Sequence, residues 1–370
     1  MPITVDGEEL WCILSDDIIL VFTLTHSNFE GETVFIMVTV SNRPPLWKVW
    51  WVACRPHTLT ASLSPVVASY HIGLSTIDPI DKGRYVSLTA QWAAFCMLMQ
   101  LGTNLHNDYA DFVKGADTDK RVGQARATQK GWLTPFQTAS AATAVLGMGL
   151  FLGVNFVASI DRSHADGVSR STFTTLIVLS SIFNAFAYTS GPWPLGYIGL
   201  GDFSIGYSGL GDLFVFLYFG LVATLMLPFL YLASASESNP DMAGIIRLFV
   251  PYAIQVAVLA TNIIVVNNLR DRHTDVEAKK RTLAVRFGAA FCRTEFRANV
   301  AIAYVLVLAD WMTHSFRIGR LLPLLSFALA LKEIQAISTK EGGKLNPHVG
   351  GSAKVQFLFC ILLGIAVRFF

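Results

Sequence analysis

Charged residues are scarce in this chain of 370 residues. Only 15% of the residues are Asp, Glu, Lys or Arg, while 53% are hydrophobic, so one soluble core could not hide the apolar side chains. The net charge of +2 is too small to indicate a nucleic-acid partner. These proportions are typical of a protein embedded in a lipid bilayer.

Cysteines are also few, and their arrangement excludes two kinds of site. The five cysteines are odd in number and scattered, and no histidines accompany them at zinc-ligand spacing (Cys12, Cys54, Cys96, Cys292, Cys360). The sequence therefore argues against a disulfide framework and against a zinc site.

Basic residues are absent from the first 42 positions. A secretory signal begins with basic residues and a transit peptide is rich in arginine, so the acidic segment 1–45 fits neither. Its apolar patches, Ile18–Leu24 and Val34–Val40, are too short to span a bilayer. We expect an N-terminal extension of unknown role over residues 1–45 and a polytopic membrane domain over residues 46–370.

Apolar blocks of about twenty residues recur along the rest of the chain, the length that a membrane-spanning helix requires. The sequence predicts an all-α membrane protein with about nine transmembrane helices, near residues 57–77, 86–106, 135–158, 172–190, 212–233, 249–268, 298–314, 319–336 and 355–370. If the N-terminus is cytoplasmic or stromal, the inner segments hold 20 of the 28 lysines and arginines. The positive-inside rule favours that orientation.

The sixth block ends in a ladder of oxygen ligands on a motif helix near residues 249–275. Asn267, Asp271 and Asp275 are each four residues apart, a spacing that returns side chains to nearly the same face of a helix. A basic cluster, Lys279 to Arg281, follows at once. Carboxylates beside basic residues at a membrane edge indicate a site for a phosphate group carried by magnesium.

The second block, on a motif helix near residues 86–111, ends in a matching cluster. Asn107 and Asp111 are again four residues apart, with Asp108 beside them, and Asp117 follows after Gly115, which we expect to end the helix. Basic residues crowd the same loop (Lys114, Lys120, Arg121, Arg126, Lys130). The sixth block comes four blocks after the second, so both run in the same direction and both clusters emerge on one face.

Together the clusters predict a diphosphate site. Two facing acidic ladders could each hold one Mg²⁺ ion, and the basic residues could neutralise the remaining phosphate oxygens. Such a site would stabilise a departing diphosphate and leave an allylic carbocation if the donor is a prenyl chain. The hydrocarbon tail would lie among the apolar helices.

The two motifs resemble those of a known family. Asn107-x3-Asp111-x5-Asp117 and Asn267-x3-Asp271-x3-Asp275 look like the aspartate-rich motifs of the UbiA superfamily of intramembrane aromatic prenyltransferases. Four sequence segments resemble the MenA-like branch of this superfamily: NDYADFVKGADTDKR, NNLRDRHTD, KRTLAVRFG and ACRPHTLTASLSPV. That branch comprises the 1,4-dihydroxy-2-naphthoate prenyltransferases of menaquinone and phylloquinone synthesis.

The resemblance implies a UbiA-like helical bundle with a central cavity and Mg²⁺-dependent transfer of a phytyl or polyprenyl group to the naphthoate ring, with loss of CO₂. It implies that Asn107, Asp108, Asp111 and Asp117 serve one magnesium, and Asn267, Asp271 and Asp275 the other. It assigns phosphate contacts to basic residues of both loops (Lys114, Lys120, Arg121, Arg126, Lys280, Arg281). Arg55 would meet the acceptor's carboxylate or a phosphate, although a positive-inside anchor explains this residue equally well.

The chain departs from the branch at two places. Lys279 stands where a glycine is usual, so the turn there could differ. GYIGLGD, ending at Asp202, recurs as GYSGLGD, ending at Asp212, and either aspartate could occupy the family's catalytic loop position.

Other functions remain open at this point. Another aromatic acceptor, homogentisate or a chlorophyllide-like ring, would share the acidic ladders. A multi-helix transporter of a metal or a phosphorylated solute would explain the helices, but it predicts ionisable groups near the bilayer midplane, whereas these clusters lie at helix ends. The expected location is a plastid (thylakoid or envelope) membrane or a bacterial plasma membrane.

Overall fold

The computed structural model describes residues 2–5, 8–14, 18–24, 34–39, 43–115, 122–163, 166–189, 209–234 and 241–370, the first four ranges by their backbone alone. The chain divides into two compact units, Met1–Val49 and Trp50–Phe370. The boundary falls within helix α1 (Leu46–Cys54).

The N-terminal unit holds a four-stranded antiparallel sheet in the order β1-β2-β3-β4 (Pro2–Val5, Glu8–Leu14, Ile18–Leu24, Val34–Thr39). Leu20 of β3 pairs with Val38 of β4, so the two apolar patches of the extension lie side by side. From the sequence we assigned this extension no role and no secondary structure. Its patches are rich in β-branched and aromatic residues, which favour strands, and neither is long enough to span a membrane as a helix.

The second unit is all-helical among its described residues, as expected for this membrane domain. Each expected span coincides with a helical segment: α2 (Leu59–Thr76), α3 (Lys82–Val113), α4 (Pro135–Ala158), α5 (Gly167–Ala187), the run α7–η3–α8 (Gly211–Phe214, Val215–Val222, Ala223–Ala233), α9 (Met242–Glu277), α10 (Leu283–Thr313), the run η4–α11 (Ile318–Ser326, Phe327–Thr339) and α12 (Asn346–Phe369). Short 3₁₀ turns, η1 (Pro56–Thr58) and η5 (Gly342–Leu345), precede α2 and α12.

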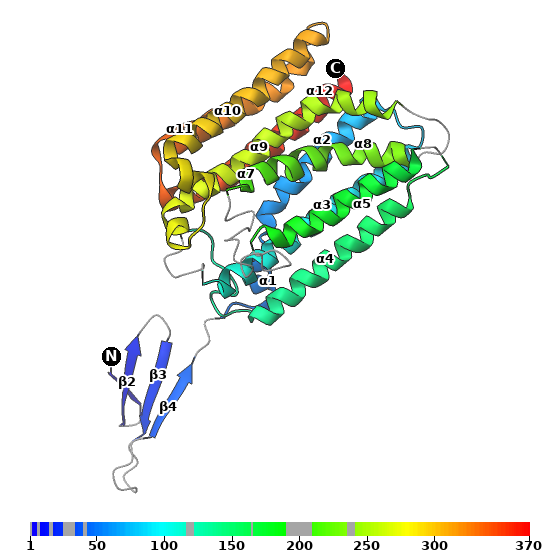
Figure 1. Ribbon diagram of the computed structural model, residues 1–370. Coiled ribbons are helices and arrows are strands. Elements are labelled where there is room, and N and C mark those ends of the chain that lie inside the picture. The colour runs from blue at the N-terminus through cyan, green and yellow to red at the C-terminus, as the bar shows by residue number, and fades with distance from the viewer. Residues whose placement is uncertain are drawn as a thin grey trace. The chain divides into compact units, whose positions relative to one another are not determined.

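The helices pack as a bundle around two hydrophobic clusters. Figure 1 shows α3, α4 and α5 alongside one another, and α9 between α10 and α12. Trp92, Phe95 and Phe156 lie in one cluster, each at most 2% exposed. Phe249 and Phe359 lie in the other and are fully buried. The interior is thus apolar along most of its length.

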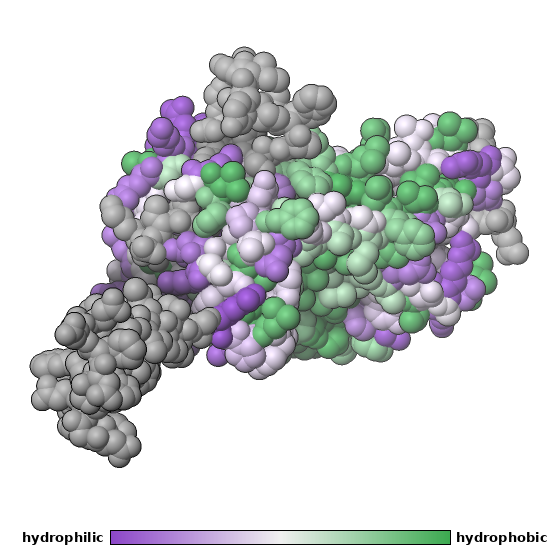
Figure 2. Space-filling model, turned by 90° about the horizontal axis from the view of Figure 1, so that it is seen from below, coloured by the Kyte–Doolittle hydropathy of each residue, from purple (hydrophilic) through white to green (hydrophobic). Residues whose placement is uncertain are grey.

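The outside of the bundle is apolar as well. Phe151, Leu176 and Val305 are each at least 60% exposed. Figure 2 shows hydrophobic surface over the middle of the helical unit and hydrophilic residues toward its ends. Among the described residues, six helical segments are long and apolar enough to cross a membrane. The chain is an integral membrane protein, while the count of nine crossings and the inward N-terminus stay predictions.

The π-helical segment η3 packs closely on α9. A Cβ atom built on Gly220 would lie 2.1 Å from the Cβ of Ala257, so only glycine lets the two backbones approach this closely. Because a π-helix is wider than an α-helix, its side chains are redirected relative to those of the flanking turns.

Both motif helices end in a residue with left-handed backbone. Gly115 follows α3 with φ 66°, so this glycine ends the helix as expected. Lys279 follows α9 with φ 58°. The Lys280 N–H donates to the Asp275 carbonyl over 2.8 Å and the Lys279 N–H donates to the Val276 carbonyl over 3.1 Å, a Schellman motif. The turn at Lys279 is therefore one that favours glycine, although a lysine occupies it.

Lys279→Gly should stabilise the protein. A left-handed conformation costs an L-residue about 1–2 kcal/mol, and the greater freedom of glycine in the unfolded chain offsets part of that gain. We expect a rise of about 2 °C in Tm in detergent, measured by thermal unfolding. Lys279→Ala is the matched control, because it removes the same exposed side chain but keeps the Cβ atom. An equal rise for both variants would contradict the backbone explanation.

Candidate functional site

A cavity of about 450 Å³ opens among the helices, and described residues of both predicted motifs line it. Asn107 and Asp111 come from the last turns of α3. Asn267, Asp271 and Asp275 come from the last turns of α9. The structure therefore brings together two ladders that are 160 residues apart at their first members.

The first ladder is buried and held by neighbouring polar groups. Asn107 is 9% exposed and its Oδ1 accepts a hydrogen bond from the hydroxyl of Thr189. Asp111 is 2% exposed, and its Oδ2 accepts from Nη2 of Arg126 over 3.2 Å. A buried carboxylate needs such partners, because desolvation penalises an isolated charge.

Lys280 joins the two motifs directly. This residue follows α9, yet its Nζ lies 3.3 Å from Oδ1 of Asp111 on α3. Both side chains line the cavity. The ammonium thus sits between the first acidic cluster and the open space, where it can contact an anionic ligand as well as Asp111.

The second ladder is held by an arginine within it. Arg270 donates from Nε to Oδ1 of Asp271 over 2.8 Å and from Nη2 to Oδ2 over 2.5 Å, a two-pronged arginine–carboxylate pair. The same Nη2 donates to Oδ1 of Asn267 over 2.8 Å. We did not assign Arg270 to the site from the sequence. Its position three residues after Asn267, on a neighbouring helix face, was the signal that could have found it.

Comparisons with known proteins identify the fold and its family. Residues 62–347 match the model of the UbiA prenyltransferase family. The chain belongs to that family. It is therefore a prenyltransferase, which sets the transporter interpretation aside.

Two curated relatives of this prenyltransferase carry the same name. The chain is 28% identical over 327 residues to the 1,4-dihydroxy-2-naphthoate octaprenyltransferase of Haemophilus influenzae, covering 86% of this chain and 96% of that protein. It is 31% identical over 265 residues to the Escherichia coli protein of the same name, covering 71% of this chain and 75% of that protein.

Among solved structures, a UbiA homolog from Archaeoglobus fulgidus bound to DMAPP and Mg²⁺ superposes with a TM-score of 0.53 at 15% identity. The superposition covers 86% of this chain and 98% of that one. At this identity the likeness concerns the fold alone.

Four of the predicted site residues have described positions away from the cavity lining. Asp108 is fully buried. Lys114 donates to the Thr189 carbonyl over 2.7 Å, and Arg281 is exposed, with its carbonyl accepting from Nε of Arg286. Asp212 is 5% exposed and accepts from Nδ2 of Asn268 over 3.3 Å. Four further predicted residues lie outside the described residues (Asp117, Lys120, Arg121, Asp202).

Polar residues outside the two ladders also line the cavity, as a polar wall that the sequence predicted only in part. Arg55 lines it, as predicted, with a left-handed backbone (φ 50°, ψ 59°) directly before Pro56. Gln100 donates to Asn104 over 3.1 Å, and Asn104 donates to Thr58 over 3.0 Å. Left-handed backbone in an arginine is unfavourable and persists only where the surroundings hold it, which is typical of functional sites.

The donor set of the ladders fits magnesium bound together with a ligand. The amide and carboxylate oxygens that line the cavity are the hard ligands that Mg²⁺ prefers. Within the part of the chain that the structure describes, no three His, Cys, Asp or Glu side chains converge into a metal site of their own. This agrees with magnesium's habit of using one or two carboxylates, waters and substrate phosphates rather than a closed protein cage.

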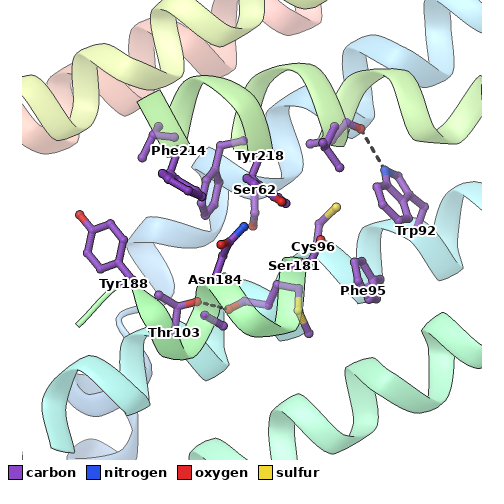
Figure 3. Close-up of a pocket in the computed structure, with 16 residues that line it drawn as sticks. Ser62, Trp92, Phe95, Cys96, Thr103, Ser181, Asn184, Tyr188, Phe214 and Tyr218 are labelled. Carbon is purple, nitrogen blue, oxygen red and sulfur yellow. Dashed lines mark hydrogen bonds between the residues drawn. The ribbon is translucent and has the colours of Figure 1, made fainter. Parts of the chain in front are cut away.

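A second, apolar cavity of about 90 Å³ adjoins the first along α3, and we call it the apolar arm. The two spaces share Thr103, Tyr188, Val215 and Phe219 as lining residues. In Figure 3, Tyr188 and Phe214 lie at one end of the arm and Trp92 and Phe95 at the other. The prenyltransferase therefore has a polar chamber at the motif ends and an apolar extension leading away from it.

Lys280→Ala should weaken binding of pyrophosphate in the presence of magnesium by about tenfold, because a hydrogen bond to a charged group contributes about 1.5–3 kcal/mol. Isothermal titration calorimetry of the purified protein would measure the change. Lys279→Ala is the control, since it removes an exposed lysine one position away that does not line the cavity. Equal losses in both variants would show that overall charge, and not the Lys280 position, controls binding.

Proposed function

We propose that this prenyltransferase moves a phytyl or polyprenyl group from its diphosphate onto 1,4-dihydroxy-2-naphthoate, with loss of CO₂, in menaquinone or phylloquinone synthesis. The observation that carries the proposal is the convergence of two oxygen-ligand ladders on one cavity that adjoins the apolar arm. The names of the curated relatives support the acceptor.

The head of the donor would lie between the ladders. Asn107 and Asp111, with Asp117, would hold one magnesium, and Asn267, Asp271 and Asp275 would hold the second. Bound magnesium would supply positive charge that stabilises the departing diphosphate. Lys280 and Arg126 line the same space, and their N–H groups would donate to phosphate oxygens.

The transfer itself needs positioning more than covalent chemistry by the protein. The bond between the allylic carbon and the diphosphate oxygen breaks, and its electron pair leaves with the diphosphate. The ring carbon that bears the carboxylate donates an electron pair to form the new carbon–carbon bond. The carboxylate then leaves as CO₂, and its bonding pair restores the aromatic ring.

The acceptor would enter on the polar wall of the cavity. The Arg55 guanidinium would meet the naphthoate carboxylate and orient the ring toward the allylic carbon, with Gln100 and Asn104 beside it. The aromatic side chains of Tyr188 and Phe219 lie where chamber and arm meet, so they would shield the reacting carbon from water.

The proposal is tested by incubating purified protein with Mg²⁺, 1,4-dihydroxy-2-naphthoate and either phytyl or octaprenyl diphosphate. We expect a decarboxylated prenyl-naphthoquinol, its loss on adding EDTA, and at least a hundredfold lower kcat for Asp271→Asn. Glu341→Gln, which changes a carboxylate outside the cavity, should leave kcat unchanged. Turnover with homogentisate but none with the naphthoate would overturn the acceptor assignment.

The tail of the donor would follow the apolar arm to Trp92. The indole Nε1 donates to the Ala223 carbonyl over 2.9 Å, and the ring stacks on Phe95 at 5.1 Å between centroids. Phe156 packs edge-on against both rings. A bulky side chain held from several sides makes a firm end wall.

Trp92→Ala should therefore favour longer donors. We expect the ratio of kcat/KM for octaprenyl over geranylgeranyl diphosphate to rise about tenfold, since removing a pocket wall changes discrimination on that scale. Trp311→Ala, which lies outside both cavities, is the control, and Trp92→Phe keeps a packed ring if the alanine variant is unstable. An unchanged ratio in both Trp92 variants would exclude this residue as the end wall.

A further inference from the structure

The turn that enters α12 reaches the site although it belongs to neither acidic motif. Segment η5 packs on α9, and Val349 and Gly350 of the first turns of α12 line the main cavity. Asn346 is the first residue of α12. The N-cap of α12 is Leu345, and the side-chain hydrogen bonds of Asn346 go to Arg270 and Val122, so capping does not explain the residue.

On one side Asn346 holds Arg270. Nη1 of Arg270 donates to Oδ1 of Asn346 over 3.0 Å. With the bonds to Asp271 and Asn267, this guanidinium makes four hydrogen bonds within the site, enough to engage four of its five N–H groups. Arg270 is only 6% exposed. Because a guanidinium is planar and rigid, fixing one edge of it fixes the two ladder side chains on the other edges.

On its other side Asn346 holds the loop that leaves the first motif. Nδ2 of Asn346 donates to the Val122 carbonyl over 2.9 Å. A Cβ atom on Gly343 would lie 3.4 Å from Cγ1 of Val122, so the η5 turn packs on the same residue. Val122 comes eleven positions after Asp111 and five after Asp117 in the chain. One side-chain amide therefore contacts the second motif at Arg270 and the segment that follows the first motif at Val122.

The chemistry of the two partners fixes the orientation of this amide. Arg270 can only donate, so the amide oxygen must face it, and the Val122 carbonyl can only accept, so the NH₂ must face the loop. Alanine would provide neither group. Aspartate would keep an acceptor for Arg270 but lose the donor to Val122.

A buried cluster anchors the turn that presents Asn346. Nδ1 of His348 lies 2.6 Å from Oε2 of Glu333 on α11, and Nζ of Lys340 lies 2.8 Å from Nε2 of His348. The ammonium of Lys340 can only donate, so Nε2 accepts and Nδ1 carries the proton toward Glu333. Glu333 and His348 are each 7% exposed and Leu345 is fully buried. The start of α12 is thus fixed against α11.

We propose that Asn346 is a positioning residue that couples the two acidic motifs. Through Arg270 it sets the orientation of the Asn267 and Asp271 oxygens, and through Val122 it anchors the segment whose Arg126 pairs with Asp111. This positioning role rests on the proposed function, because it requires those oxygens to bind magnesium diphosphate. Its contribution is to pre-organise the site for that ligand rather than to touch it.

The test uses the full-length protein and magnesium pyrophosphate as the probe. Asn346→Ala should weaken pyrophosphate binding about tenfold by calorimetry and raise KM for the prenyl diphosphate by a larger factor than it lowers kcat. Asn346→Asp should fall between alanine and wild type. Asn299→Ala is the matched control, because its amide bonds to Asn262 away from the cavity. That control should bind pyrophosphate as the wild type does.

A double-mutant cycle with Arg270→Lys tests the coupling itself. If Asn346 acts through Arg270, the double variant should lose much less binding than the product of the two single losses. Multiplicative losses, or wild-type binding by Asn346→Ala, would overturn the proposal. The proposal would also be overturned if Asn299→Ala lost as much binding as Asn346→Ala and both variants showed a similar fall in Tm. That pattern indicates general destabilisation.

The same experiments distinguish failure of the positioning role of Asn346 from failure of the proposed function. If the wild type binds magnesium pyrophosphate but transfers no prenyl group to the naphthoate, the acceptor assignment fails while the Asn346 comparison still decides the positioning role. If the wild type does not bind magnesium pyrophosphate, both proposals are overturned.

Discussion

The lengths of α3 and α9 are the constraint on which this site depends. With 32 and 36 residues, these helices extend about 48 and 54 Å, whereas the hydrocarbon core of a bilayer is about 30 Å thick. Each helix can therefore cross the membrane and still carry several turns beyond it. The ladders occupy those last turns, where carboxylates need not enter hydrocarbon. A shorter helix would force its acids into the lipid or its apolar residues into water.

Placing acids at two adjacent helix ends creates a second requirement, which is charge balance. Asp111 is almost fully buried and lies against Arg126 and Lys280, which come from different loops. Asp271 lies against Arg270 from its own helix. These pairs stabilise the acids when no ligand is bound, and a diphosphate would offer the same basic groups an alternative anion. The basic residues that contact each ladder would thus balance negative charge both with and without a bound diphosphate.

Sequence periodicity was enough to find the ladders, because a spacing of four residues is a local property of a helix. It also predicted that both would face one cavity, since a span and the fourth span after it run in the same direction. Contacts between distant residues left no such signal. Asn346 and Val122 are 224 positions apart, and nothing in the local sequence around either predicts their hydrogen bond. Lys279 shows that residue type alone does not predict a turn. This lysine adopts the left-handed backbone that the turn requires, although that conformation costs a lysine more than a glycine.

Helix α3 links the two ends of the proposed donor site. Asp111 lies 19 residues after Trp92, so their positions along the axis differ by about 28 Å, close to the thickness of the hydrocarbon core. Thr103 lies between them and lines both the polar chamber and the apolar arm. If the diphosphate of the donor is held near Asp111, its tail would lie along the same helix as far as Trp92. The chemistry of the head group and the selection of chain length would then depend on one element, and a change in the tilt of α3 would affect both.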